Sequence, residues 1–445
     1  MLVDRYPSED VFGRVPELAD QTDPVLVQLD HLLDDDMLYQ QVRGDLAQRY
    51  RLTPVHGRHA TPAEALLRLL VVQHLSAWSY AETVTRVADS LVLRWFCRVY
   101  FQRVPAQTTL LRWAQTLRAE TLQALVDRAA QLAQQAQVTR ARKLRIASTC
   151  VQTPIHHPTD SGLLGDGVRV LSRLLRRAKP LLVQVQAPLA GVRDACRSRM
   201  RSARRLLQQL HRVRQGSTGE DAAAAQRGRY MRLLEITHQT VRQAQRVQAA
   251  LEGWQPHALG SNTPSSLPVQ ERLAPRLLAQ FDRFLPLVQR GMQQARARVL
   301  DGQPIPATAK VLSLFEPHTR VVKRRKLGAP VEFGRQVMLD EVAGGIVTRF
   351  HVLADVESEC HQALPAVWHH CALFGRPPRV VAGDRRLHTK GVEQTAQGLG
   401  VTHVVIPRTG PLSAAQRARE HARVWKRRYR WRAGIEGRIH SLRRD

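Results

Sequence analysis

A long helical tract separates the strand-like segments of this chain and limits the folds that it can adopt. Residues 143–151 alternate apolar with charged or small side chains and are rich in β-branched residues, which is typical of a β-strand. Residues 162–300 are rich in Arg, Gln and Leu, and their apolar residues recur at helical spacing. Strand patterns return only after Pro304. The sequence therefore predicts an α/β fold whose first strand is followed by a large all-α insertion.

The segment after Pro304 alternates between strand and helix patterns. We expect strands at residues 310–315, 334–342, 346–352, 379–384 and 402–407. Gly344 and Gly345 predict the turn of a hairpin between the second and third of these strands. Helices are expected over about residues 358–374 and from about residue 413 to the last residue.

The N-terminal part of the chain reads as helical. Thr61-Pro62 and Ser79 are start signals for two helices, the first of them strongly apolar. Residues 103–113 then form a short turn followed by a polar, Thr-rich helix start, which fits a helix-turn-helix and an ordinary helical hairpin equally well. We expect a helical N-terminal domain at 1–141, a first strand and loop at 142–162, the insertion at 163–303 and the remaining core at 304–445. Within the insertion, residues 216–219 predict a turn and residues 256–268 a linker.

The charge of the chain points to an acidic partner. Lys and Arg number 67 against 38 Asp and Glu, which gives a formal net charge of +29. Such self-repulsion is relieved when a polyanion binds, and arginine forks suit phosphate groups. An Arg-rich composition inherited from a GC-rich genome is the alternative explanation.

Other features of the sequence favour the cytoplasm. The five cysteines form no closely spaced pair, which is typical of reduced thiols; they are Cys97, Cys150, Cys196, Cys360 and Cys371. The first residues do not resemble a signal peptide, and no run of about 20 apolar residues predicts a membrane span. Two Cys-His groups, at 360–361 and 369–371, lack zinc-finger spacing and are better explained as ordinary core or surface residues.

Two acidic residues stand out as candidate site residues. Asp384 directly follows an apolar strand, and the carboxyl edge of a sheet is where such folds hold ligands and metals. Glu436 lies on a strongly basic helix between Gly434 and Gly437, and glycines inside a helix cost about 1 kcal/mol each. We therefore expect another backbone or a nucleic acid to approach this helix closely, although Glu436 also fits a simple ion-pair role.

Four sequence motifs carry a resemblance to a known family. They are Ile155-His156-His157-Pro158-Thr159-Asp160-Ser161-Gly162-Leu163-Leu164, Gly383-Asp384-Arg385, Val405-Ile406-Pro407-Arg408 and Trp431-Arg432-Ala433-Gly434-Ile435-Glu436-Gly437-Arg438-Ile439. Together they resemble the DDE transposases of bacterial insertion sequences, near the ISNCY group. The resemblance implies an RNase H-like mixed sheet with a helical insertion after its first strand. It also implies cutting and joining of DNA ends with two Mg²⁺ or Mn²⁺ ions.

The resemblance also assigns roles to residues and partners. The catalytic and metal-binding acids are an Asp on the first strand, an Asp on the fourth and a Glu on the following helix, and Asp384 and Glu436 match the second and third. Position 147 corresponds to the first acid, so we expect residues 147, 384 and 436 to lie close together. The implied partner is double-stranded DNA, at the terminal inverted repeats of the element and at the target, bound by a homodimer in the nucleoid.

The chain departs from the family pattern at three places. Ala147 replaces the first acid, Arg386 replaces a usual Gly, and the chain stops at Asp445 where the family continues. Asp160 is the first candidate to replace the missing acid, although it lies beyond the strand. Ala147 fits a decayed element and also a substitution made to trap the enzyme. We therefore expect a transposase that is inactive because of Ala147. The alternatives are a DNA-binding remnant or repressor of the element, and a nuclease of the same fold.

Basic and aromatic residues mark the expected DNA contacts. One is Arg112, at the possible recognition helix, and the others lie on the last helix: Lys426, Arg427, Arg428, Arg430, Arg432 and Arg438. Among them, Trp425, Tyr429 and Trp431 either stack on bases or pack into the sheet, and we expect packing for two of the three.

Overall fold

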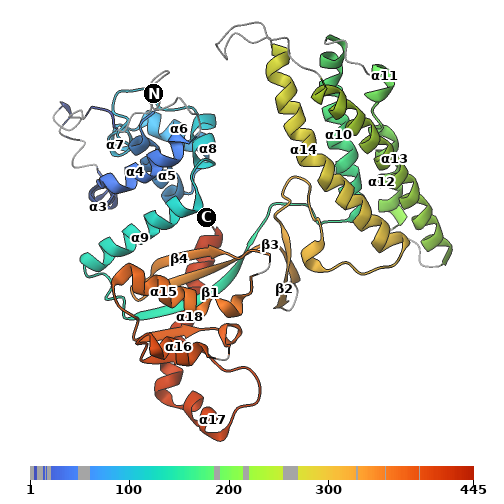
Figure 1. The fold of residues 1–445 in the computed structure, drawn as a ribbon. Coiled ribbons are helices and arrows are strands. Elements are labelled where there is room, and N and C mark those ends of the chain that lie inside the picture. The colour runs from blue at the N-terminus through green and yellow to red at the C-terminus, as the bar shows by residue number, and fades with distance from the viewer. Residues whose placement is uncertain are drawn as a thin grey trace. The chain divides into compact units, whose positions relative to one another are not determined.

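The computed structural model divides the chain into two compact units (Figure 1). The residues that it describes are 5–7, 14–15, 17, 22–48, 61–184, 191–213, 220–253, 269–326, 329–355, 357–389 and 391–444. One unit combines residues 1–149 with 336–445, and the other comprises residues 150–335. No helix in the described ranges is long and apolar enough to cross a membrane.

The first unit begins with a cluster of short helices around one apolar core. They are α3 (Pro24–Leu33), α4 (Asp36–Ala47), α5 (Ala63–Ser76), α6 (Tyr80–Asp89), α7 (Leu91–Phe96), α8 (Gln107–Ala114) and the longer α9 (Ala119–Gln135). Side-chain caps start several of them: Asp35 accepts a hydrogen bond from Met37 N, and Ser79 and Glu82 form a capping box. Leu66, Leu69 and Leu110 are fully buried in the shared core.

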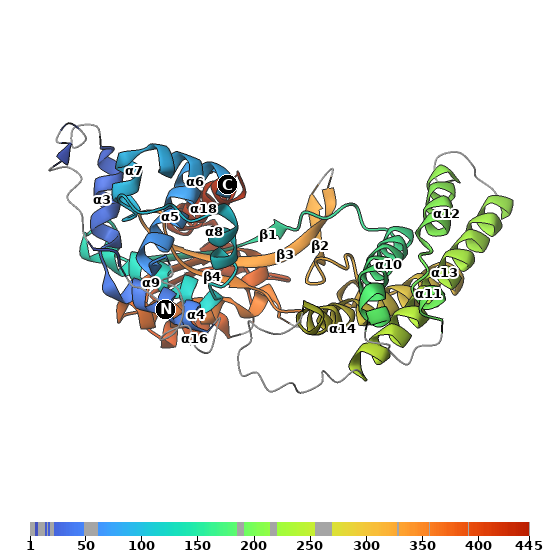
Figure 2. The same cartoon turned by 90° about the horizontal axis from the view of Figure 1, so that it is seen from above.

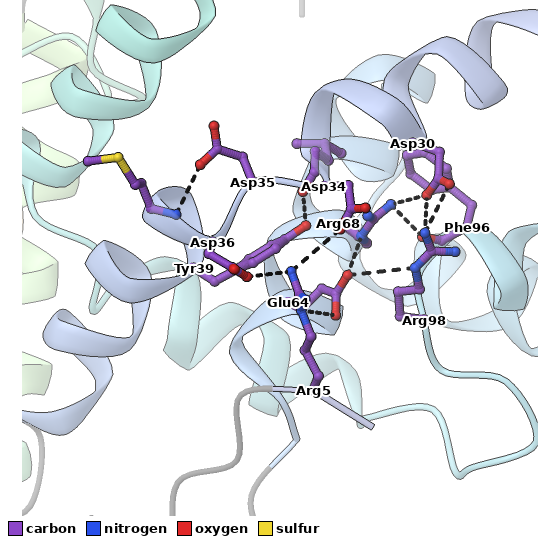
Figure 3. Close-up of polar contacts among 12 residues, drawn as sticks. Arg5, Asp30, Asp34, Asp35, Asp36, Tyr39, Glu64, Arg68, Phe96 and Arg98 are labelled. Atoms are coloured by element: carbon purple, nitrogen blue, oxygen red, sulfur yellow. Dashed lines mark hydrogen bonds and ion pairs between the residues drawn. The ribbon is translucent and has the colours of Figure 1, made fainter. Parts of the chain in front are cut away.

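A buried ion network ties these helices together (Figure 3). The Arg68 side chain on α5 is completely buried and donates to Asp30 on α3 at 2.6 Å, to Glu64 at 3.2 Å and to the carbonyl of Phe96 at 3.2 Å. Arg98 reaches the same two carboxylates, at 2.7 Å from Asp30 and 3.6 Å from Glu64. Because one cation is wholly enclosed, its removal leaves buried carboxylates short of positive charge.

We therefore expect Arg68→Met to lower the free energy of unfolding by about 3 kcal/mol, the lower end of the cost of breaking a buried ion pair. The measurement is urea unfolding of the full chain followed by tryptophan fluorescence, since Trp78, Trp95 and Trp113 all pack in or against this core. Exposed Arg112→Met, in the same helical cluster, is the matched control and should change stability by about 0.5 kcal/mol or less. Equal losses for the two variants would contradict the role of the buried network.

A mixed sheet follows the helical cluster. Its strands are β1 (Lys143–Gln152), β2 (Arg320–Lys326), β3 (Ala329–Val342), β4 (Ile346–Val352), β5 (Val380–Gly383) and β6 (His403–Val405). The order across the first unit is β4-β3-β1-β5-β6, with β3 and β4 antiparallel and with β1, β5 and β6 parallel. The first half of β3 pairs with β2 in the second unit. The mixed α/β class predicted from the sequence is confirmed.

Helices cover both faces and one edge of the sheet. Leu144 and Ile146 of β1 pack towards α15 (Ala363–Phe374) and α16 (Val392–Gly398). The opposite face packs against α18 (Arg423–Arg444), which follows α17 (Ala414–His421). At the β4 edge, the Gln123 amide on α9 donates to the carbonyl of Thr348 and accepts from Phe350 N. This side chain satisfies backbone groups of an edge strand that would otherwise be open to another chain.

The second unit is built mainly from long helices that run side by side (Figure 2). They are α10 (Asp160–Gln184), the short α11 (Val192–Ala195), α12 (Met200–Val213), α13 (Glu220–Glu252) and α14 (Val269–Ala295), followed by a π-helical turn at Arg296–Leu300 and a 3₁₀ turn at Ala307–Ala309. Leu171, Leu175, Val247 and Phe281 lie at the centre of their apolar core.

Several elements differ from the sequence-based expectation. Residues 310–315 form no strand: Val311 and Leu314 pack on the helices of the second unit, and the backbone of Val311 is bonded by the Gln294 side chain. The strand lies later in the chain, at β2. Its mostly basic sequence lacks the apolar alternation from which a strand is predicted. The final helix is interrupted at Ala422, which ends α17 before α18 begins. The expected turn at 216–219 and linker at 256–268 lie outside the described residues.

Candidate active site at the carboxyl edge of the sheet

The register of β1 and β5 makes positions 147 and 384 neighbours. The two strands run parallel and pair from Lys143 with Val380 to Ile146 with Gly383. The next residue on β1 is Ala147, and the next along the chain from β5 is Asp384. Adjacent strands lie about 4.8 Å apart, so the continued register sets these two positions side by side.

Both positions belong to the face that α18 covers. Ala147 lies in one apolar cluster with Val337, Leu339 and Ile435, and Ile435 immediately precedes Glu436 on α18. On β5, Val380 and Ala382 pack against α18, and Asp384 continues their alternation. The β1–β5 pairing thus ends one residue before Ala147 and Asp384, and the α18 segment that carries Glu436 packs over Ala147 through Ile435.

The two carboxylates at this edge are exposed. Asp384 accepts a hydrogen bond from Arg385 N at 2.7 Å and caps the 3₁₀ turn Arg385–Leu387. The Glu436 side chain is 66% exposed and receives one from Arg432 Nη2 at 3.1 Å, four residues earlier on the helix. The ion-pair interpretation of Glu436 therefore holds in part, and it leaves most of the carboxylate open to solvent.

The donor set does not fit a two-metal centre. A pair of divalent ions needs bridging carboxylates on both sides, but the side chain at position 147 is a methyl group, and Ala147 is only 6% exposed among apolar neighbours. Within the described residues, no three His, Cys, Asp or Glu side chains are grouped to hold a metal ion. Asp384 and Glu436 alone could offer at most a weak site for one hard cation.

Arg145 fastens α18 to the sheet two residues before position 147. Its guanidinium donates to the carbonyl of Trp431 at 2.7 Å, stacks over the Trp431 ring at 4.8 Å and forms an ion pair with the fully buried Glu341 on β3. A Cβ atom at Gly434 would overlap this guanidinium. The close approach expected at Gly434 is therefore real, but the group that approaches is an arginine side chain rather than a backbone or a nucleic acid.

Gly437 differs from Gly434 in its surroundings, because a Cβ there would meet open space. We expect Gly434→Ala to lower the free energy of unfolding by about 1–3 kcal/mol, since the added methyl displaces the guanidinium from Trp431 and Glu341. Gly437→Ala should instead raise it by about 0.5–1 kcal/mol through helix propensity. Urea unfolding of the two variants beside the parent chain checks the pair, and the same sign for both would contradict this account of Gly434.

The predicted DNA contacts on α18 are mostly exposed, and the Arg438 guanidinium lies against Gly345 in the β3–β4 turn. Lys426, Arg427, Arg430 and Arg438 are exposed and Arg428 is half-buried; within the described chain, none of these five forms an ion pair. The aromatic residues between them all pack against the sheet: Trp425, Tyr429 and Trp431 contact the cluster of Val380, Ala382 and Val405. The packing interpretation therefore holds for all three rings rather than for two.

The possible recognition helix is α8. Leu110 and Trp113 point into the helical core, while Gln107, Thr108 and Arg112 are exposed. An exposed polar face of this kind is compatible with contact to a DNA groove, and the helix-turn-helix remains a prediction.

Asp160 is not available as a replacement for the missing acid. Its carboxylate is 8% exposed and receives hydrogen bonds from Arg298 at 2.7 Å and Gln294 at 2.9 Å. These partners belong to the unit of residues 150–335, whereas positions 147, 384 and 436 belong to the other. Asp160 therefore joins the start of α10 to the end of the helical bundle.

One buried acid at the same edge was missed by the sequence analysis. Glu359 is 9% exposed, accepts a hydrogen bond from Ser148 Oγ and lies 3.6 Å from Arg386. This contact gives the unusual Arg386 a local partner. The only signal in the sequence was an acid at the predicted start of the 358–374 helix, which is ordinary for a helix N-terminus.

In the two Cys-His groups, His369 and Cys360 make polar contacts with residues outside the groups. His369 bonds Asp127 at 3.0 Å, and this hydrogen bond raises the pKa of His369. Burial lowers the pKa of His370 to about 4 and raises the pKa of the Cys371 thiol. Cys360 Sγ lies 3.2 Å from Ser358 Oγ.

Comparison with known proteins gives one match, in the N-terminal helices. Residues 15–116 match a family model described as Transposase domain (DUF772), and this range covers α3 to α8. No curated protein and no solved structure matches the chain. The helical N-terminal region is thus similar to a transposase domain, and the similarity supports a transposase role for this protein.

Proposed function

We propose that this protein is a DDE-type DNA transposase of an insertion sequence, near the ISNCY group, that holds the ends of its element and does not cut them while residue 147 is Ala. The observations that support the proposal are the β1–β5 register, which ends one residue before Ala147 and Asp384, and the packing of Ala147 with Ile435, the residue before Glu436. The transposase-domain similarity of residues 15–116 supports it independently.

The sheet topology supports an RNase H-like core as the frame of this site. The expected pattern has the acids on the first strand, the fourth strand and the following helix. Within the first unit, Ala147 lies on β1, Asp384 follows β5 as the fourth strand after β1, β3 and β4, and Glu436 lies on α18. The long helices α10 to α14 come directly after β1, as a helical insertion would.

In an intact site of this kind, two divalent ions activate the attacking oxygen and stabilise the leaving oxygen of a phosphodiester. The residues of this chain do not complete such a site, because Ala147 supplies no ligand. What they do supply is positive charge: α18, which carries Glu436, also carries exposed arginines that can contact a phosphate backbone. A protein that occupies element ends without cutting them acts as a repressor of its own element, and we assign that role as the second candidate function.

The proposal is tested by electrophoretic mobility shift with duplexes taken from the DNA that flanks the gene. A homodimer on terminal inverted repeats should give a discrete complex that persists with an excess of unrelated duplex, because specific binding exceeds non-specific binding by about 10³-fold or more. If unrelated duplex displaces the complex as efficiently as unlabelled specific duplex does, end recognition is contradicted.

A further inference from the structure

The loop that carries the His-His-Pro-Thr-Asp-Ser motif walls a pocket that the proposed function leaves unused. The pocket has a volume of about 890 Å³ and lies within the unit of residues 150–335. Its wall is formed by the loop and the start of α10, by α12 and by α13. The residues on which the argument rests are His157, Thr159, Arg204, His211, Arg212 and Tyr230.

The pocket is cationic. Arg204 and Arg212 come from one face of α12, and no carboxylate is among the described residues that line the pocket. Within the described chain, neither arginine forms a hydrogen bond or ion pair through its guanidinium. Both guanidinium groups are exposed to solvent, and cations that line a concave surface attract anions more strongly than the same groups on a convex surface.

A second pocket on the other side of the loop provides a contrast. It measures about 400 Å³ and is also lined by residues 154–159, but its arginine, Arg169, is paired with Asp166 at 2.8 Å, and Glu316 lines it as well. Its charges are therefore balanced. The cationic character of the larger pocket is a local property and does not simply follow from the net charge of the protein.

The polar and aromatic groups of the larger pocket fit a nucleotide chain. Thr159 Oγ1 accepts from Gly162 N at 3.0 Å and so caps the start of α10, whose free N–H groups favour a phosphate. The rings of His157 and His211 are exposed and offer faces on which a base can stack, whereas the Tyr230 ring is only 8% exposed and packs in the core of the helices. Asp160 does not offset the positive charge, because Arg298 and Gln294 hold its carboxylate.

We infer that this pocket binds a short segment of single-stranded nucleic acid, with its phosphates at Arg204 and Arg212 and a base against the histidine rings. The volume lies within the range of about 300–1,000 Å³ that is usual for small-ligand sites, which admits a few nucleotides and excludes a double helix. This inference rests on the proposed function to the extent that the chain handles DNA. It gives the motif loop a role apart from the acidic edge.

The test measures fluorescence anisotropy of a fluorescein-labelled thymidine oligomer of about eight nucleotides with the full chain. The double variant Arg204→Glu with Arg212→Glu should lower the affinity about tenfold or more, since two phosphate contacts are reversed. The matched control is Arg201→Glu with Arg205→Glu, which makes the same charge change on α12 at exposed positions that do not line the pocket. Its effect should stay near twofold, and equal losses for the two double variants would overturn the inference.

Two further arms identify the ligand. Unlabelled oligomer should displace the probe, whereas ATP and inorganic phosphate at the same phosphate concentration should not. Equal competition by ATP would show that the ligand is a free nucleotide and not a strand. Duplex binding is measured in parallel. If the parent chain does not bind duplex but still binds the oligomer through Arg204 and Arg212, the proposed function fails and the assignment of the pocket is retained. If the duplex binds and the oligomer does not, the pocket assignment fails alone.

Discussion

We expect this chain to leave supercoiled plasmid DNA uncut in the presence of Mg²⁺ or Mn²⁺. Asp384 and Glu436 cannot together neutralise and bridge two dications, and the methyl of Ala147 packs against Ile435 where the third carboxylate is needed. The basic residues around Glu436 further disfavour metal entry. Ala147→Asp should restore metal affinity and with it nicking, measured by Mn²⁺ calorimetry and by plasmid relaxation on gels.

Ala147→Asn is the matched control for this experiment, because it has the size of Asp without the charge. It should bind Mn²⁺ no better than the parent chain and should not nick. Nicking by the unaltered chain that disappears in Asp384→Ala would show that another acid completes the site. Since Asp160 is held by Arg298 and Gln294, Glu359 beside Ser148 would then be the first residue to test.

The second large effect concerns salt. Each phosphate that a cation neutralises contributes about −0.9 to the slope of log affinity against log salt concentration. If five of the cations of α18 each contact one phosphate, the slope is about −4.5, and a fourfold rise in salt lowers duplex affinity about 500-fold. The five are Lys426, Arg427, Arg428, Arg430 and Arg438.

Lys426→Gln with Arg430→Gln should reduce the steepness of this slope by about 1.8, measured by anisotropy of a labelled duplex over a salt series. Arg176→Gln with Arg177→Gln removes the same charge from exposed positions of α10 and serves as the control. An affinity that does not change with salt would contradict nucleic-acid binding altogether, and equal slope changes in the two double variants would exclude α18 as the main contact.

Local patterns determined much of the secondary structure. The alternation of 143–151 and the glycine turn at 344–345 correctly predicted β1 and the β3–β4 hairpin, because a strand with one apolar face shows its period in the sequence. The same rule failed at residues 310–315, where the apolar residues serve the helical bundle, and at β2, whose sequence Arg320–Lys326 is mostly basic. Short apolar runs do not reveal which partner they bury against.

The candidate acids were also found from the sequence, since a strand ending in Asp384 and a glycine-flanked Glu436 are local signals. The placement of Asp384 near position 147, which only the resemblance led us to expect, depends on the register of β1 with β5, and no local pattern in the sequence encodes that register. The contact of Arg145 with Trp431 joins residues 286 positions apart, and it explains Gly434 in a way that no neighbouring residue could. Sequence periodicity records which face of an element avoids water, whereas the choice of partner for that face depends on the packing of the whole chain.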